Sequence, residues 1–141
     1  MALGSGIQRE ECYLAPMERA VEIFAVIHLG ITGLSHILAP RAWIDFFVGL
    51  REQGHPGVFA VGFMSLFIGS VIAAFYNVWS GHGLVLTLYG WTLVLKGALY
   101  LIFPSYGMRG LRRIDAEKPY HLAVPGVGLL VLAGVVVYGW L

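Results

Sequence analysis

The sequence predicts an all-α, polytopic membrane protein in which four transmembrane helices form two tandem helical hairpins within a single domain, residues 1–141. Of the 141 residues, 58% are hydrophobic and 12% are charged, and this charged fraction is about half of that usual in soluble domains. A chain with so few polar groups cannot cover a surface that faces water, so lipid must surround much of it. Four apolar segments are long enough to cross a bilayer, and they lack the alternation of polar and apolar positions that a membrane strand requires.

The four predicted transmembrane helices cover residues 18–39, 57–78, 83–103 and 120–140. Proline marks their limits: Pro16 precedes the first helix, Pro40 and Pro104 end the first and third, and HPG at 55–57 opens the second. These are positions at which proline begins or terminates a helix. Tryptophan rings prefer the headgroup layer of a membrane, and those near span ends are Trp43, Trp79 and Trp140.

The connecting loops predict the orientation of the helices in the membrane. Residues 40–56 and 104–119 lie on the same side, and their basic residues are Arg41, Arg51, Arg109, Arg112, Arg113 and Lys118. The basic residues on the opposite side are Arg9 and Arg19. Because short basic loops stay in the cytoplasm, we expect these two loops to be cytoplasmic and both termini to lie outside, in a bacterial inner membrane.

Two totals limit the class of partner. The formal net charge of +1 offers no basic face that could follow a nucleic-acid backbone. The single cysteine, Cys12, excludes an intrachain disulfide and a cluster of thiolate metal ligands. The expected partners are the lipid bilayer and a membrane protein, either a different subunit or a second copy of this chain.

The chain repeats itself with a constant offset, because GLSHILAP at 33–40 aligns with GALYLIFP at 97–104. The same offset matches Gly62 with Gly126 further along the chain. We expect the first two helices to form one hairpin and the last two a second, related by an axis along the membrane normal. The alternative is that any two apolar hairpins that end in proline look alike.

Lys96 stands near the middle of the third predicted helix, in the segment YGWTLVLKGALYLIFP. It lies roughly 11 Å from the helix end at 1.5 Å per residue, so its side chain reaches only part of the way to water. A charged lysine at mid-span costs about 2.5–3.5 kcal/mol. Glu22, near the opposite interface, lies roughly 15 Å away in depth, so Lys96 needs another partner.

The repeat places Lys96 at the depth of Thr32, with His28 and His36 one turn to either side on the same helix face. Ser65 of an antiparallel helix reaches the same depth. The five side chains, Lys96, His28, Thr32, His36 and Ser65, predict a ligand-binding site that could attract an anion or carry protons. The alternative is that Lys96 is a structural tie or meets an acidic group on another subunit, with the histidines hydrogen-bonded inside the protein.

No cofactor is predicted, although haem and quinone stay open as alternatives. Two histidines on one helix face cannot ligate opposite sides of one iron, so a second helix would have to contribute. His121 starts the fourth helix within about 5 Å in depth of His36. No carboxylate or thiol joins the histidines, so we expect no metal site.

Two further patterns concern packing. Ser65, Gly69 and Ala73 form a stripe of small residues along the second helix, which lets another helix approach closely. The loop RAWIDFFVGL at 41–50 has an apolar face typical of a short helix at the membrane interface, formed by Trp43, Ile44, Phe46, Phe47 and Leu50.

A glycine-containing first span that ends in GLSHILAP, followed by RAWIDFFVGL and three more spans, resembles the DoxX-like group of small four-helix membrane proteins. The resemblance covers most of the chain and implies the same four-helix fold. Some members of that group look like membrane subunits of quinone-linked redox systems. The resemblance carries no catalytic residue onto this sequence.

The sequence therefore favours a non-enzymatic accessory or scaffold subunit that binds a membrane partner protein. No nucleophile–base pair, nucleotide loop or metal motif forms a complete catalytic constellation. The alternative is a small transporter, or a membrane protein that binds a quinone or another hydrophobic ligand, with the polar site around Lys96.

Overall fold

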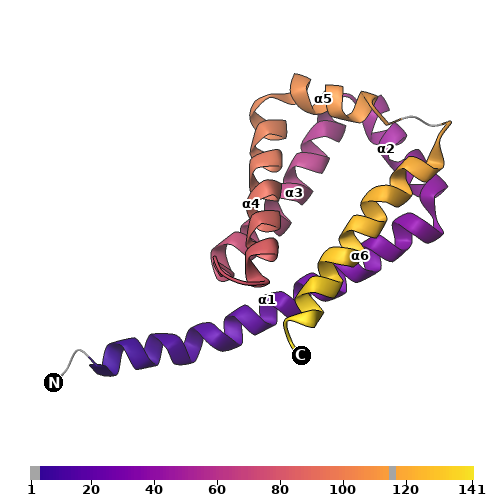
Figure 1. Ribbon diagram of the computed structural model, residues 1–141. Coiled ribbons are helices and arrows are strands. Elements are labelled where there is room, and N and C mark those ends of the chain that lie inside the picture. Colours follow the sequence, from indigo (N-terminus) through magenta and orange to yellow (C-terminus); the bar gives the residue numbers. More distant parts are fainter. Residues whose placement is uncertain (1–3, 115–116) are drawn as a thin grey trace.

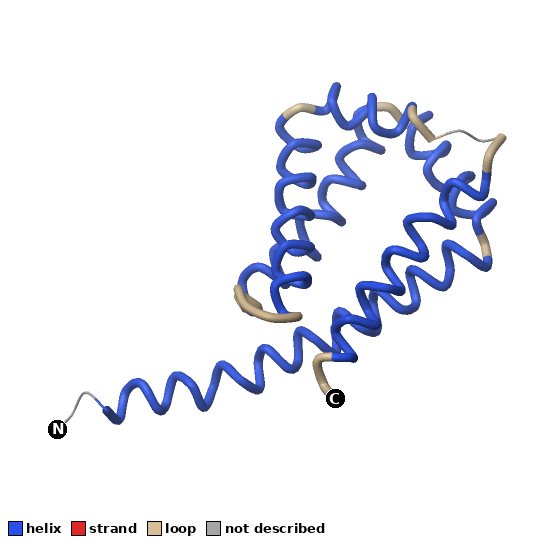
Figure 2. The backbone as a smooth tube through the Cα atoms, viewed as in Figure 1, coloured by secondary structure: helices blue, strands red, loops and turns tan. Residues whose placement is uncertain are grey.

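The computed structural model describes residues 4–114 and 117–141, and it describes side chains from residue 15 onward except at 115–116 and 119–120. The side chain of Cys12 lies outside this part. The described chain is all-helical, which confirms the predicted fold class (Figures 1 and 2). Its elements are α1 (Gly4–Leu38), α2 (Pro40–Glu52), α3 (His55–Phe75), α4 (Gly83–Ile102), α5 (Pro104–Arg112), the short 3₁₀ helix η1 (Pro119–Leu122) and α6 (Ala123–Tyr138).

Four segments are long and apolar enough to span a membrane, so this is an integral membrane protein. They are Ala15–Leu38, His55–Phe75, Gly83–Ile102 and His121–Tyr138. The second ends three residues before its predicted end, because Tyr76 already has extended backbone angles (φ −138°, ψ 101°). The two chain ends lie on the side opposite α2 and α5 (Figure 1).

Proline separates each of two spanning helices from a short helix that follows it. Ala39 (φ −129°, ψ 52°) and Phe103 (φ −124°, ψ 74°) have left the helical region, as expected for a residue that precedes proline. Pro40 and Pro104 then start α2 and α5 in a new direction. The predicted interfacial helix after the first span is thus α2, and α5 is its counterpart after the third span.

The spanning helices pair differently from the prediction. The closest packing joins α3 with α4 and α1 with α6, whereas α1 meets α3 and α4 meets α6 over much less of their length (Figure 1). The predicted hairpins, first with second span and third with fourth, are therefore wrong. The connection from α3 to α4 is short, which makes them antiparallel neighbours. Between α1 and α3, in contrast, lies the 13-residue helix α2, which is roughly 20 Å long.

Glycine permits the close contact between α3 and α4. A Cβ atom at Gly69 would lie 2.6 Å from the backbone nitrogen of Val94 and 2.8 Å from the carbonyl oxygen of Gly90. One at Gly97 would lie 2.8 Å from the carbonyl oxygen of Gly62. The two backbones touch at both levels, so α3 and α4 gain van der Waals contact that larger residues would prevent.

The pair α1 and α6 meets in the same way. A Cβ atom at Gly33 would lie 2.8 Å from the carbonyl oxygen of Gly126, and one at Gly126 would lie 2.9 Å from that of Gly33. Gly33 and Gly126 occupy the positions that the sequence repeat matches with Gly97 and Gly62. Glycines matched by the predicted repeat thus make similar contacts in the two helix pairs.

Two buried clusters connect the helices. The larger joins all four spanning helices near the chain termini, and its members are Val21, Ala25, Leu29, Ile72, Tyr76, Leu86, Ala133 and Val136. The smaller fixes α2 and α5 on the other end of α3, and it contains Leu50, Val58, Val61 and Leu111. The pairs therefore converge at the end that carries the termini and diverge toward α2 and α5 (Figure 2).

We predict that Gly69→Leu destabilises the protein by about 1–3 kcal/mol, because the new side chain would overlap the backbone of α4. The measurement is the free energy of unfolding in mixed detergent micelles, followed by circular dichroism. Gly134→Leu is the matched control, since a Cβ atom at Gly134 meets nothing within 4 Å. Equal stability of the two variants would contradict a close contact at Gly69.

Candidate functional site

Lys96 lies on α4, six residues before the last residue of the helix, Ile102, or about 9 Å from that end. Its side chain is exposed in the isolated chain. The Nζ atom lies 5.6 Å from the centroid of the Tyr100 ring, within the range of a cation–π contact. Among the described side chains no carboxylate pairs with it. A lysine inside the membrane span thus has an aromatic ring as its one specific neighbour in the described part of the chain.

The other residues of the predicted ligand site have different neighbours from Lys96. His28 stacks on Phe24 of its own helix, with ring centroids 5.9 Å apart, and Ser65 is buried on α3. No hydrogen bond, ion pair or ring contact of the described side chains joins Lys96 to these two or to the other members, Thr32 and His36. For the residues of α1 the physical reason is the helix pairing, because α1 packs on α6 while α4 packs on α3.

Thr32 and His36 belong to a separate polar cluster where α1 meets α2. The buried His36 uses Nδ1 in a 2.8 Å hydrogen bond to the carbonyl oxygen of Thr32, so Nδ1 carries the proton. Its ring stacks on Trp43 of α2 at 4.0 Å between centroids. The Trp43 indole N–H donates to the Ser35 hydroxyl at 3.0 Å. This cluster fixes the angle between α1 and α2.

Among the described residues, no group of three or more His, Cys, Asp or Glu side chains is arranged to hold a metal ion. His36 keeps one ring nitrogen, Nε2, outside the hydrogen bond to Thr32. His121 lies in η1, in front of α6.

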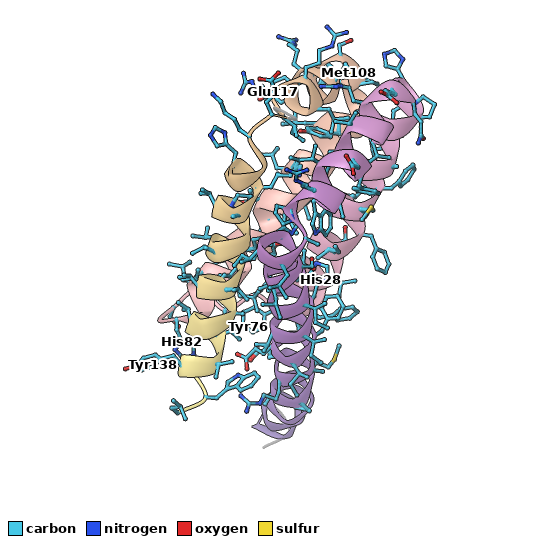
Figure 3. The ribbon with its side chains drawn as sticks, turned by 90° about the vertical axis from the view of Figure 1, so that its right-hand side faces the viewer. His28, Tyr76, His82, Met108, Glu117 and Tyr138 are labelled. Atoms are coloured by element: carbon cyan, nitrogen blue, oxygen red, sulfur yellow. The ribbon has the colours of Figure 1, made fainter. Side chains whose placement is uncertain are left out.

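The Glu22 carboxylate on α1 contacts three other side chains. The Tyr76 hydroxyl donates to Oε1 at 3.0 Å, and the Trp140 indole N–H donates to Oε2 at 2.8 Å. Arg19 reaches Oε2 at 3.4 Å, and its guanidinium carbon lies 4.1 Å from the centroid of the Trp140 ring. Figure 3 shows Tyr76 between α1 and α6. One carboxylate thus joins α1 to the ends of α3 and α6.

Electrostatics explain why this arrangement is stable. A carboxylate that accepts several hydrogen bonds beside a cation is well compensated. Tyr76 follows the last residue of α3, and burial raises the pKa of its phenol, with the Glu22 hydrogen bond and the charges of Glu22 and Glu18 raising it further. The phenol therefore keeps its proton at physiological pH and remains a donor.

From the sequence, Glu22 is expected only as a distant partner for Lys96, and its contacts with Tyr76 and Trp140 are not predicted. A signal was present, because Tyr76 and Trp140 are separated by the repeat offset and both are polar-tipped aromatic residues at a span end. An acidic residue at the same end of another helix could have been matched with these two donors.

The stripe of small residues on α3, Ser65, Gly69 and Ala73, lies along the contact with α4. Gly69 lies against α4, and a Cβ atom at Gly90 would lie 2.9 Å from Cβ of Ile72 and 3.5 Å from the backbone nitrogen of Ala73. Ser65 is buried one turn away from Gly69. The stripe is thus part of the internal contact between α3 and α4.

Comparison of the chain with protein-family models, curated proteins and solved structures found no match.

We predict that Tyr76→Phe destabilises the protein by about 1–3 kcal/mol, because it removes a donor from a nearly buried carboxylate. The loss should shrink when Glu22→Leu is already present, since the acceptor is then gone. The measurement is a double-mutant cycle of unfolding free energies in detergent. Tyr138→Phe on the exposed face of α6 is the control, with a change within about 0.5 kcal/mol. Additive effects of the two substitutions would contradict the coupling.

Proposed function

We propose that this protein is a non-enzymatic accessory or scaffold subunit whose membrane partner supplies the group that faces Lys96. The observation that carries the proposal is the exposed amine of Lys96 within a spanning helix, without a carboxylate partner among the described side chains. The partner is a different membrane protein or a second copy of this chain.

Magnitudes support this proposal. A charged lysine at the centre of a spanning helix costs about 2.5–3.5 kcal/mol. A cation–π contact such as that between Lys96 and Tyr100 contributes about 0.5–1 kcal/mol at an exposed site. The difference leaves Lys96 under-compensated in the isolated chain. An acidic or strongly polar group on a partner helix would offset it and would also select that partner.

The surface of the spanning helices suits such a role. Large apolar side chains follow one another along the exposed side of α3 at intervals of four residues, namely Phe59, Phe63 and Phe67. Exposed apolar surface of this kind fits lipid and a partner helix equally well. Lys96 favours a partner helix over lipid at this surface, because a partner can supply an acidic or polar group.

We also propose an orientation of the helices in the membrane and an origin of the chain by internal duplication. The basic residues of α2, α5 and the segments next to them favour a cytoplasmic position for these helices, with both termini outside, in a bacterial inner membrane. The equivalent glycine contacts of the two helix pairs support an internal duplication. The resemblance to DoxX-like proteins fits a small four-helix subunit.

We predict that Lys96→Leu abolishes recovery of the partner, whereas Lys96→Arg retains it, because arginine keeps the positive charge. The measurement is purification of the tagged protein from its native membrane in a mild detergent, with quantitative mass spectrometry of the proteins that accompany it. For a second copy of this chain, the readout is the oligomer mass.

The matched control is Thr92→Leu, one turn away from Lys96 on the same exposed part of α4. It should leave the partner in place. A stoichiometric partner that persists after Lys96→Leu would contradict the proposal. A monomer that carries a bound quinone or another small molecule, lost after Lys96→Leu, would instead favour the ligand-binding alternative.

A further inference from the structure

A groove of about 450 Å³ lies where α4 ends and α5 begins. Its wall on the membrane side is formed by Leu99 and the exposed Ile102 of α4 and by the exposed Phe103 that follows this helix. Its other wall is formed by the first turns of α5, with Tyr106 and Arg109. The groove therefore has an apolar side that continues along a spanning helix and a polar side on a helix that lies across its end (Figure 1).

The charge of the polar side is positive. The guanidinium carbon of Arg109 lies 5.7 Å from the centroid of the Tyr106 ring. No carboxylate of the described chain forms an ion pair with Arg109. Arg112 and Arg113 follow on the exposed face of the same helix region. In contrast, Gly107 and Leu111 are the buried residues of α5. This division between an apolar buried face and a basic outer face is typical of a helix at the membrane surface.

We propose that this groove binds an anionic phospholipid, with the phosphate of the headgroup on Arg109 and an acyl chain along Leu99 and Ile102. An arginine forms strong, charge-assisted hydrogen bonds with phosphate oxygens. Basic pockets beside spanning helices on the cytoplasmic side are suited to anionic headgroups. A zwitterionic lipid would bring an ammonium group toward the same arginines and would bind less well.

The corresponding corner between α1 and α2 is the internal comparison. The groove there is smaller, about 240 Å³, and its lining consists of Ala42, Trp43 and Phe46. With the repeat offset, Asp45 stands where the second corner has Arg109. The first corner thus has an acid at the position of Arg109, and its arginine, Arg41, is not among the residues that line the groove. Of these two grooves, only the one at the α4–α5 corner is lined by an arginine.

The test uses native mass spectrometry of the full chain in detergent, titrated with phosphatidylglycerol or with phosphatidylcholine of the same acyl chains. The wild-type protein should retain phosphatidylglycerol preferentially. Arg109→Gln should weaken retention of phosphatidylglycerol roughly five- to tenfold and leave phosphatidylcholine unchanged, as expected for one arginine–phosphate contact near the surface. Arg41→Gln, which removes one charge at the other corner, should leave both lipids unchanged.

Several outcomes would overturn the proposal: equal retention of the two lipids by the wild type, no effect of Arg109→Gln, or an equal effect of Arg41→Gln. Tight binding of glycerol 3-phosphate alone would also overturn it, because the apolar wall would then have no role. Salt dependence in the wild type gives a readout that needs no variant. Raising the salt concentration should weaken retention of phosphatidylglycerol, and unchanged retention would count against Arg109 as the contact.

Discussion

Direct contact between helix backbones at glycine is the constraint on which the rest of this structure depends. In a bilayer the hydrophobic effect does not drive one apolar helix onto another, so packing must supply the attraction. Gly69 and Gly97 let α3 and α4 touch, and Gly33 and Gly126 do the same for α1 and α6. Each pair is tight, whereas the two pairs meet mainly near the chain termini. The molecule is therefore two close helix pairs joined at one end.

This arrangement decides which polar groups are satisfied within the chain. Glu22 lies where the pairs converge, so α3 and α6 both bring a donor within reach, and its carboxylate is nearly enclosed. Lys96 lies on the diverging part of α4, and α1 with its histidines packs elsewhere. The acid is thus part of the internal structure, while the base remains accessible to a lipid or a partner. Glu22 and Lys96 thus differ in role because Glu22 lies where the two helix pairs converge and Lys96 lies where they diverge.

Sequence reasoning predicted the number, type and approximate limits of the spanning helices, because hydropathy, proline and glycine act locally. It failed on the pairing, which depends on the length and direction of connections. The loop after Pro40 forms a helix that separates α1 from α3, and no local pattern reveals how far apart it holds them. The α1 residues of the expected site around Lys96 lie on the other helix pair for the same reason. Residues at one depth, such as Thr32 and Lys96, are neighbours only if their helices pack together.

The offset of the predicted repeat also relates residues that differ in type but make similar contacts. Tyr76 and Trp140 differ as residues, yet they occupy matched positions and donate to the same Glu22 carboxylate. The residue matched with Glu22 is Leu86, which is fully buried in the same cluster. Two equivalent donors thus converge on an acceptor that exists once. If the halves arose by duplication, one acid near the axis between them is sufficient, because a second carboxylate there would add like-charge repulsion without additional donors.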